Sequence, residues 1–376
     1  MTYQVFTSVF ECAEAWDQFL PKDHHLASVH CAIIERCQLE DVSFRYVLIL
    51  NDSKEIVSAV YFQILHFSAR HYDFPLTSNF LLQKLEARVM KNGFNILVCG
   101  NLLRIDAPGI YYDKQKANAS AVFSVLEKFF HSLHPYPNVI LIKDWNQQLD
   151  DNWIDDFNFQ SWPSDLTMKL DLPGSWKSFD DYVSALRHRY AQRIRKARKK
   201  FLPVIRKEFS LSEIESFSSQ LERLYLEVVK RQPVRIIIVN GNYFIEMKET
   251  YAGRFRLFGY FLENNLVGFS SNIAFDSLWE LHYIGMDYDV NEKHWLYFNI
   301  LFDAISDAIE EKKSELELGR TARAAKTSLG AHPVYFKNYM RIKGVIPRLA
   351  VKLLGQNFNE NAGQHWEERN AIRTQK

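Results

Sequence analysis

The sequence predicts a mixed α/β fold that is built twice along the chain. The chain has 376 residues, which is longer than an ordinary domain with a single hydrophobic core. Both halves show the same order of hairpin, strand, helix and strand. The composition, 47% hydrophobic and 24% charged, is that of a globular protein. We therefore expect an internal duplication of one α/β unit.

The first half begins this order with a hairpin. Residues 44–64 read as two strands around the polar turn 51–54. After a helical stretch, 94–101 (FNILVCGN) is an apolar strand. Residues 117–134 have the apolar spacing of a helix, and 138–145 (NVILIKDW) close the half as a buried strand.

The second half repeats the order. Residues 255–275 read as a strand, an Asn-Asn turn and a strand, and 278–288 (LWELHYIGMDY) form the next strand. Residues 293–313 predict a long amphipathic helix, and 315–319 (ELELG) a last short strand. The repeated order favours two related units rather than one large core.

The boundary between the units is expected near 160–175, where two prolines, a glycine and a short alternating strand occur. We divide the chain into a first domain, 1–165, a second domain with the site, 166–355, and a polar tail, 356–376. A helix follows the boundary, with Ser178 as its N-cap and Asp180 and Asp181 at its positive end.

That helix is expected to continue into a strongly basic stretch. Residues 187–200 (RHRYAQRIRKARKK) carry eight Lys or Arg and no acid, although the whole chain has a net charge of +1. Its apolar stripe is Val183, Tyr190, Ile194, Ala197 and Phe201. A solvated helix normally mixes in Glu for i,i+4 pairing, so this charge favours a polyanionic partner. The cations expected to bind it are Arg187, Arg189, Arg193 and Lys196.

Several classes of protein are not indicated. Glu11, Glu14 and Asp17 interrupt the start, which predicts no signal peptide, and no apolar run is long enough to span a membrane. The four cysteines show no CxxC pair, so a reduced cytoplasm is the expected setting. No His, Cys and Asp cluster has metal-ligand spacing, so no metal and no permanently bound cofactor are expected.

Three phrases carry a family resemblance. SFDDYVSALRHRYAQRIRKARKKF resembles the opening of the catalytic half of FemAB-like proteins, which belong to the GNAT-fold acyltransferase superfamily. ELGRTARAAKTSLGAHPVYFKNYMR (317–341) is similar to their terminal strand, turn and Lys-containing helix, and DLTMKLDLPGSW to the strand before the basic helix. The resemblance implies two tandem GNAT-like folds and acyl transfer from a thioester or ester to an amine, without a metal.

The chain departs from that pattern in two places. Simple GNAT enzymes hold the pyrophosphate of coenzyme A with a Gly-rich loop, whereas no glycine lies between Met286 and Asn299 here. The long coiled-coil arm of the aminoacyl-tRNA-using Fem ligases is also not indicated. Both departures bear on the identity of the acyl donor.

Catalytic candidates lie on the strand WELHYIG. Alternation places Glu280, His282 and Ile284 on one face and Leu281 and Tyr283 on the other. Either Glu280 or His282 could take the proton of an attacking amine, with His282 favoured because its ordinary pKa is nearer neutrality. The alternative is that both side chains only form structural hydrogen bonds in an interdomain seam.

A second candidate cluster lies in LELGRTARAAKTSLGAHP. Gly319 allows a tight turn, Thr321 is expected to cap the next helix, and Arg320 and Lys326 offer charge for a phosphate or carboxylate. The alternative is a surface turn with solvated cations.

The sequence thus predicts a cytoplasmic N-acyltransferase that is peripheral on the inner face of the membrane. The co-substrate would be an acyl-CoA or an acyl-carrier-protein thioester, and the acceptor an amine on a lipid precursor, amino sugar or cell-wall intermediate. Alternatives are an aminoacyl-tRNA-dependent Fem-type transferase, with tRNA less favoured, and a non-catalytic protein that binds anionic surfaces. Residues 344–355 (GVIPRLAVKLLG) predict a short amphipathic element that fits bilayer contact or docks as a C-terminal helix.

Overall fold

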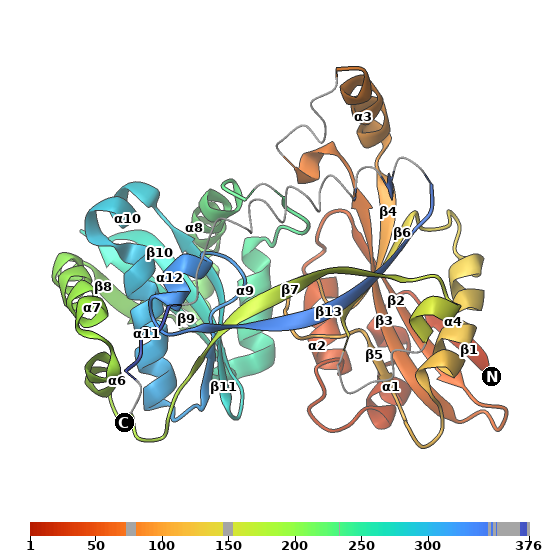
Figure 1. The fold of residues 1–376 in the computed structure, drawn as a ribbon, viewed down its shortest axis with the longest axis horizontal. Helices are drawn as coiled ribbons and strands as arrows, with labels where there is room; N and C mark the ends of the chain where they lie inside the picture. Colours follow the sequence, from red (N-terminus) through yellow and green to blue (C-terminus); the bar gives the residue numbers. More distant parts are fainter. Residues whose placement is uncertain are drawn as a thin grey trace. The chain divides into compact units, whose positions relative to one another are not determined.

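The structure is a computed structural model that describes residues 1–72, 80–145, 153–232, 234–344, 347–348, 351 and 369–373. The chain forms two compact units (Figure 1). Unit 1 comprises 1–165, 233–238 and 336–362, and unit 2 comprises 166–232, 239–335 and 363–376. The contacts thus place residues 336–362 in unit 1. Chain order alone assigned 166–355 to the second domain.

The sheet of unit 1 has the strand order β1-β2-β3-β4-β6-β13, with β5 paired to β3. Its strands are β1 (Thr2–Phe6), β2 (Val42–Leu50), β3 (Ile56–Phe67), β4 (Phe94–Cys99), β5 (Ile110–Tyr112), β6 (Val139–Trp145) and β13 (His332–Ile342), the last of which begins in unit 2. Its helices are α1 (Ala13–Phe19), α2 (Ser28–Arg36), α3 (Phe80–Asn92), α4 (Ala119–Ser132) and α5 (Trp153–Asp156). One apolar core forms where α4 packs on this sheet, and another forms where α1 and α2 pack on it.

The sheet of unit 2 has the strand order β7-β12-β11-β10-β9-β8. Its strands are β7 (Gln160–Asp171), which begins in unit 1, β8 (Ile205–Glu208), β9 (Phe255–Leu262), β10 (Asn265–Ala274), β11 (Leu278–Met286) and β12 (Glu315–Glu317). Its helices are α6 (Phe179–Ala185), α7 (His188–Phe201), α8 (Leu211–Val229), α9 (Gly241–Tyr251), α10 (Tyr288–His294), α11 (Leu296–Glu310) and α12 (Arg323–Thr327). Strands β11 and β12 run parallel.

The predicted order of elements is confirmed in both units. Unit 1 shows the hairpin β2–β3, strand β4, helix α4 and strand β6, and unit 2 shows β9–β10, β11, α11 and β12. The parallel pairs β4–β6 and β11–β12 are each connected through a helix that covers the sheet. Short 3₁₀ turns occur at Val9–Glu11, Ala69–His71 and Ala252–Arg254.

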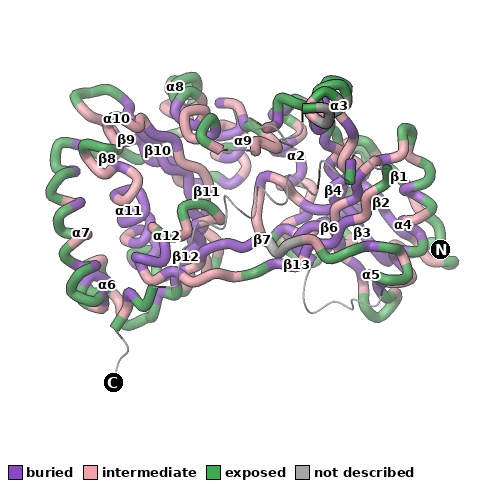
Figure 2. Tube along the Cα trace, turned by 45° about the horizontal axis from the view of Figure 1, so that its top comes forward, coloured by how far each residue is buried: buried purple, intermediate pink, exposed green. Residues whose placement is uncertain are grey.

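Helices cover both faces of the sheet in unit 2. On one face, Tyr190 and Ile194 of α7 and Ile300 of α11 share a core with Leu281 of β11. On the other face, α8 and α9 pack against β10 and β11. Buried strands therefore lie between two helical layers, and the outer side of α7 is exposed (Figure 2).

The single helix predicted from Ser178 through the basic stretch forms two helices, α6 and α7. Ser178 caps α6 as predicted, in a capping box with Asp181. The backbone then becomes extended at Leu186 and Arg187, and α7 starts afresh at His188. The break has a tertiary cause, because Leu186 forms a bridge with Ile372 and the N–H of Arg187 donates to the carbonyl of Ala371 at 2.9 Å. From Tyr190 onward the predicted apolar stripe is buried.

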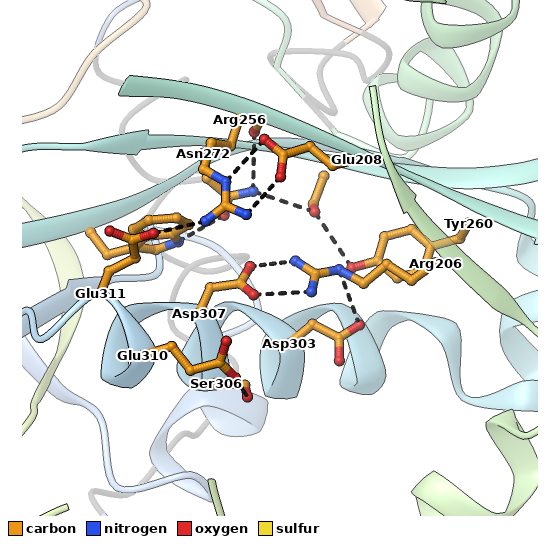
Figure 3. A network of polar contacts seen from close by, with 12 residues as sticks. Arg206, Glu208, Arg256, Tyr260, Asn272, Asp303, Ser306, Asp307, Glu310 and Glu311 are labelled. Atoms are coloured by element: carbon orange, nitrogen blue, oxygen red, sulfur yellow. Dashed lines mark hydrogen bonds and ion pairs between the residues drawn. The ribbon is translucent and has the colours of Figure 1, made fainter. Parts of the chain in front are cut away.

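Ion pairs anchor α11 to β8 (Figure 3) and to α7. Arg206 of β8 forms a two-pronged pair with the buried Asp307. Asp303, one helical turn earlier, receives Arg198 of α7 at 2.6 Å. Arg256 of β9 bridges carboxylates on β8 and α11 in the same network. Some cations of the basic segment therefore have a structural role.

Most of the predicted amphipathic element 344–355 and of the tail 356–376 lies outside the described residues. In the part of the chain that the structure describes, no helix is long and apolar enough to cross a bilayer. The same residues contain no group of three His, Cys, Asp or Glu side chains arranged to hold a metal ion.

Candidate functional site

A β-bulge at His282 sets the geometry of β11. On β10, the successive residues Ser271 and Asn272 lie opposite Tyr283 and Leu281, which are two positions apart. His282 is therefore the extra residue of the bulge. A bulge interrupts the regular alternation of side chains and redirects the extra one, and such bulges are frequent next to active sites.

The bulge corrects the predicted faces of this strand. We expected Ile284 to share a face with Glu280, and Tyr283 to lie opposite. Instead, Ile284 packs against the core beneath α11. Tyr283 lies with Glu280 on the face covered by α8 and α9, where its ring meets Tyr225 at 5.4 Å. Alternation fails because it holds only while the ladder is regular.

Three buried side chains form a continuous hydrogen-bonded chain on this face. Nδ1 of His282 lies 2.6 Å from Oε1 of Glu280, and Nε2 lies 2.7 Å from the hydroxyl of Tyr243. Because a carboxylate only accepts, Nδ1 carries the proton, and the Tyr243 hydroxyl donates to Nε2 of the neutral ring. The chain can therefore take up a proton at Nε2, while Glu280 stabilises the resulting imidazolium.

Helix α9 positions Tyr243. The carbonyl oxygen of the Asn240 side chain accepts from the N–H of Tyr243 and begins the helix. The rings of Phe244 on α9 and of His282 and Tyr283 on β11 then contact the phenol of Tyr243. Burial raises the pKa of Tyr283 well above its usual value, with the charge of Arg320 partly opposing the shift. The phenol of Tyr283 is therefore held in its neutral form.

The far edge of β11 loses its partner at the bulge. Strand β12 pairs with β11 only from Leu278 to Glu280, and no strand within the described ranges continues on that side. The side chain of His282 is 3% exposed, although the residue as a whole is half-buried. The exposed surface of His282 thus belongs mostly to its backbone atoms. Backbone of β11 that β12 does not pair, beside a proton-accepting chain, is an arrangement that can bind a carbonyl group.

Strand β12 adds a second carboxylate, and helix α12 adds a lysine. Glu317 lies in register with Glu280 on the neighbouring strand and accepts from Oγ1 of Thr167 at 3.0 Å. Nζ of Lys326 donates to the carbonyl of Gly319 at 3.1 Å, where a positive φ of 76° makes the predicted tight turn. Burial lowers the pKa of Lys326 to about 7, although the nearby charge of Glu317 opposes this.

The second predicted cluster is thus partly corrected. Lys326 is not a solvated surface cation but is only 3% exposed. Thr321 is exposed and does not cap the next helix, because Ala322 occupies the N-cap position of α12 without a side-chain hydrogen bond. The charge of Arg320 acts on Tyr283 and opposes the rise of its pKa.

The basic helix lies away from this cluster. Helix α7 packs on α10 and α11, which cover the opposite face of the sheet from α8 and α9. Arg187 begins α7, Arg189 stacks on Tyr190, and Arg193 lies 4.4 Å from the ring centroid of Phe298. Lys196 is exposed. The structure therefore unites His282, Glu280, Gly319, Arg320 and Lys326, whereas Arg187, Arg189, Arg193 and Lys196 belong to the basic helix and its N-cap on the opposite face of the sheet.

The region before α11 is occupied by side-chain caps. The carboxylate of Asp287 accepts from the N–H groups of Asp289 and Val290 at the start of α10. The Asn291 side chain accepts from the N–H of Tyr297 in the first turn of α11. These main-chain donors are the kind that would bind a phosphate, and here side chains already use them.

Sequence reasoning missed Tyr243 and Glu317. Glu317 carries a weak signal, since it is an acid within an apolar strand, ELELG. Tyr243 lies 39 positions before His282, and only the helix start at Asn240 could have been read from its surroundings. Its proximity to His282 depends on tertiary packing.

No protein-family model matches the chain, and no curated protein matches it. Solved structures do. FemX superposes with a TM-score of 0.52 at 10% identity, over 94% of this chain and 100% of FemX. The C-terminal domain of a protein described as a lysylphosphatidylglycerol synthetase from Agrobacterium fabrum gives 0.51 at 10% identity, over 97% and 100%. A tandem GNAT protein from the clavulanic acid biosynthesis pathway gives 0.52 at 9% identity, over 91% and 99%.

Identities this low establish the fold alone. The chain has the mixed α/β fold of these structures, one of which is a tandem GNAT protein, as the sequence predicted.

Proposed function

Starting from this tandem GNAT fold, we propose that the chain is an N-acyltransferase whose chemistry takes place in unit 2. The observation that supports it most is the Glu280–His282–Tyr243 chain at the bulge of β11. The acyl group would come from an acyl-CoA or acyl-carrier thioester. The acceptor would be an amine on a lipid precursor, amino sugar or cell-wall intermediate.

The proposed step is attack of a neutral amine on the acyl carbonyl carbon. A carbon–nitrogen bond forms, and the carbonyl oxygen becomes an oxyanion, which main-chain N–H groups of β11 beyond its pairing with β12 would stabilise. The amine loses a proton through the Tyr243 hydroxyl to Nε2 of His282, and Glu280 stabilises the imidazolium. The carbon–sulfur bond then breaks, and the proton returns to the leaving thiolate. Lys326, with a pKa lowered to about 7, lies beside Glu317 and can exchange protons near neutral pH.

A second candidate donor is an aminoacyl ester such as aminoacyl-tRNA. The capped helix starts favour it, since Asp287 and Asn291 occupy main-chain donors where coenzyme A phosphates would otherwise bind. The same attack would then break a carbon–oxygen bond. FemX and the Agrobacterium fabrum domain share the fold but at 10% identity, so they do not decide between donors.

The experiment that tests the proposal combines two measurements. Mass spectrometry of lipids and cell-wall precursors from a deletion strain identifies the amine that loses its acyl group. The purified chain is then given that amine with acyl-CoA, acyl-carrier-protein thioester or aminoacyl-tRNA, and product and thiol release are followed. We expect amide formation with one donor class. A tRNA-dependent reaction would lose affinity steeply with salt, and a thioester reaction much less.

A non-catalytic role is the outcome that opposes the proposal. It would be indicated if Glu280→Gln and His282→Ala, each folded, left every acyl transfer unchanged. Charge reversal at Arg193 and Lys196 would in that case abolish the function.

A further inference from the structure

The end of α7 exposes apolar side chains among cations. Leu202 is 79% exposed and Ile205 is 68% exposed, the two highest values for large apolar side chains among the described residues. They flank the turn from α7 into β8, while Phe201 and Val204 are turned inward. Exposed and buried apolar side chains thus lie next to each other at this turn, and the exposure is confined to Leu202 and Ile205.

A row of free cations leads to these two side chains. Arg195, Lys196 and Lys199 are exposed on α7. None of the three side chains forms an ion pair or hydrogen bond within the part of the chain that the structure describes. Leu202 retains helical backbone angles, so it continues the row that Arg195 and Lys199 begin, at spacings of four and three residues. No acid occurs from Tyr182 through Lys207.

The neighbouring cations are already committed to the fold. Arg198 pairs with Asp303 and Arg206 with Asp307, and Lys207 pairs with Glu213. Arg195, Lys196 and Lys199 have no comparable role among the residues that the structure describes. Their charge is therefore available to a partner.

We propose that this surface, defined by Arg195, Lys196, Lys199, Leu202 and Ile205, docks on an anionic lipid bilayer. The cations would lie at the headgroups while Leu202 and Ile205 enter the acyl boundary. A nucleic acid would use the cations but leave both apolar side chains in water. A second copy of the chain would bring two positive helices together. The bilayer uses both features, and the inference does not depend on the acyl donor.

Flotation with vesicles tests the surface as a whole. The full chain should float with phosphatidylcholine vesicles that contain phosphatidylglycerol, and not with phosphatidylcholine alone. Added salt should weaken the binding. Each of Arg195→Gln, Lys196→Gln and Lys199→Gln should weaken it by about fivefold. The matched charge control is Lys22→Gln with Lys114→Gln, two exposed lysines of unit 1, which should not change flotation.

The apolar pair is tested separately. Leu202→Ser with Ile205→Ser should reduce flotation by at least tenfold with all cations retained, whereas Phe80→Ser, which removes a side chain 67% exposed in unit 1, should not. Unchanged flotation of the double variant would overturn the proposal. Binding to RNA that competes with vesicles and is equally strong in the double variant would overturn it in favour of a nucleic acid.

A fluorescent label reports insertion directly. All four native cysteines are buried, so Leu202→Cys can be labelled selectively with a polarity-sensitive dye. We expect a blue shift on anionic vesicles for this position and none for the matched Phe80→Cys. A label at position 202 that stays in water while the protein floats would contradict the proposal.

Discussion

Nε2 of His282 lies 2.7 Å from the hydroxyl of Tyr243, a residue 39 positions earlier in the chain. The contact joins a bulged strand to the helix above it and extends the Glu280–His282 pair into a path for a proton. A residue that merely filled space would be replaceable by Phe without consequence for chemistry.

Tyr243→Phe tests that path. The ring and its packing against Tyr283 are retained, so we expect the protein to fold. Loss of the hydroxyl should lower kcat by about 10²-fold, the lower end for a lost general acid–base group. Steady-state kinetics and thermal unfolding measure the two effects. Tyr225→Phe, at the neighbouring ring, is the matched control and should keep its rate.

Lys326→Met should change how stability depends on pH. Burial lowers the pKa of Lys326 from 10.5 to about 7, so between these values the unfolded chain binds one more proton than the folded chain. The free energy of unfolding from this group therefore rises with pH across that window, and below pH 7 the buried ammonium destabilises fully. The Met variant should lose this slope and gain most at low pH.

Urea unfolding at a series of pH values measures the effect. Lys196→Met, at an exposed position, should keep the wild-type slope. An unchanged slope in Lys326→Met would show that the buried amine keeps an ordinary pKa.

Asp307→Asn should destabilise unit 2. It leaves Arg206 beside a neutral amide in a largely buried site, and we expect a loss of about 3 kcal/mol in the free energy of unfolding. A double variant, Arg206→Met with Asp307→Leu, should recover part of the loss, because neither charge is then buried alone. Glu227→Gln, which breaks an exposed pair with Lys230, should have much less effect. Equal losses of unfolding free energy in Asp307→Asn and Glu227→Gln would contradict the structural role of the Arg206–Asp307 pair.

Ser178→Ala should weaken the start of α6. The Ser178 hydroxyl accepts from the N–H of Asp181, so its removal should cost about 1 kcal/mol. Ser184→Ala, at an exposed position inside the same helix, should have no such cost because alanine is a better helix former. Chemical denaturation compares the two, and a larger effect at Ser184 would exclude the capping role.

Local signals predicted the elements well. The hairpins, the helix start at Ser178 and the tight turn at Gly319 follow from residue types that fix their own backbone. The break at Leu186 could not be predicted in this way. No proline or glycine marks it, and it depends on a bridge to Ile372 at the far end of the chain.

Only the residues of the candidate site that follow a local sequence pattern were predicted. Glu280 and His282 were identified from their spacing, but the bulge depends on how β10 pairs with β11, which spacing does not show. Tyr243 comes from a separate helix. The positive charge of α7 did not predict where that helix lies, because charge density does not say which face of a sheet a helix covers.

The rate of amide formation by His282→Asn, followed by mass spectrometry with the identified donor and amine, tests the central claim most directly. Asn at this position removes the proton-accepting nitrogen Nε2. We predict a rate at least about 10²-fold below wild type in a variant that still folds and unfolds cooperatively. A folded variant that forms the amide at the wild-type rate would show that the proton leaves by another route.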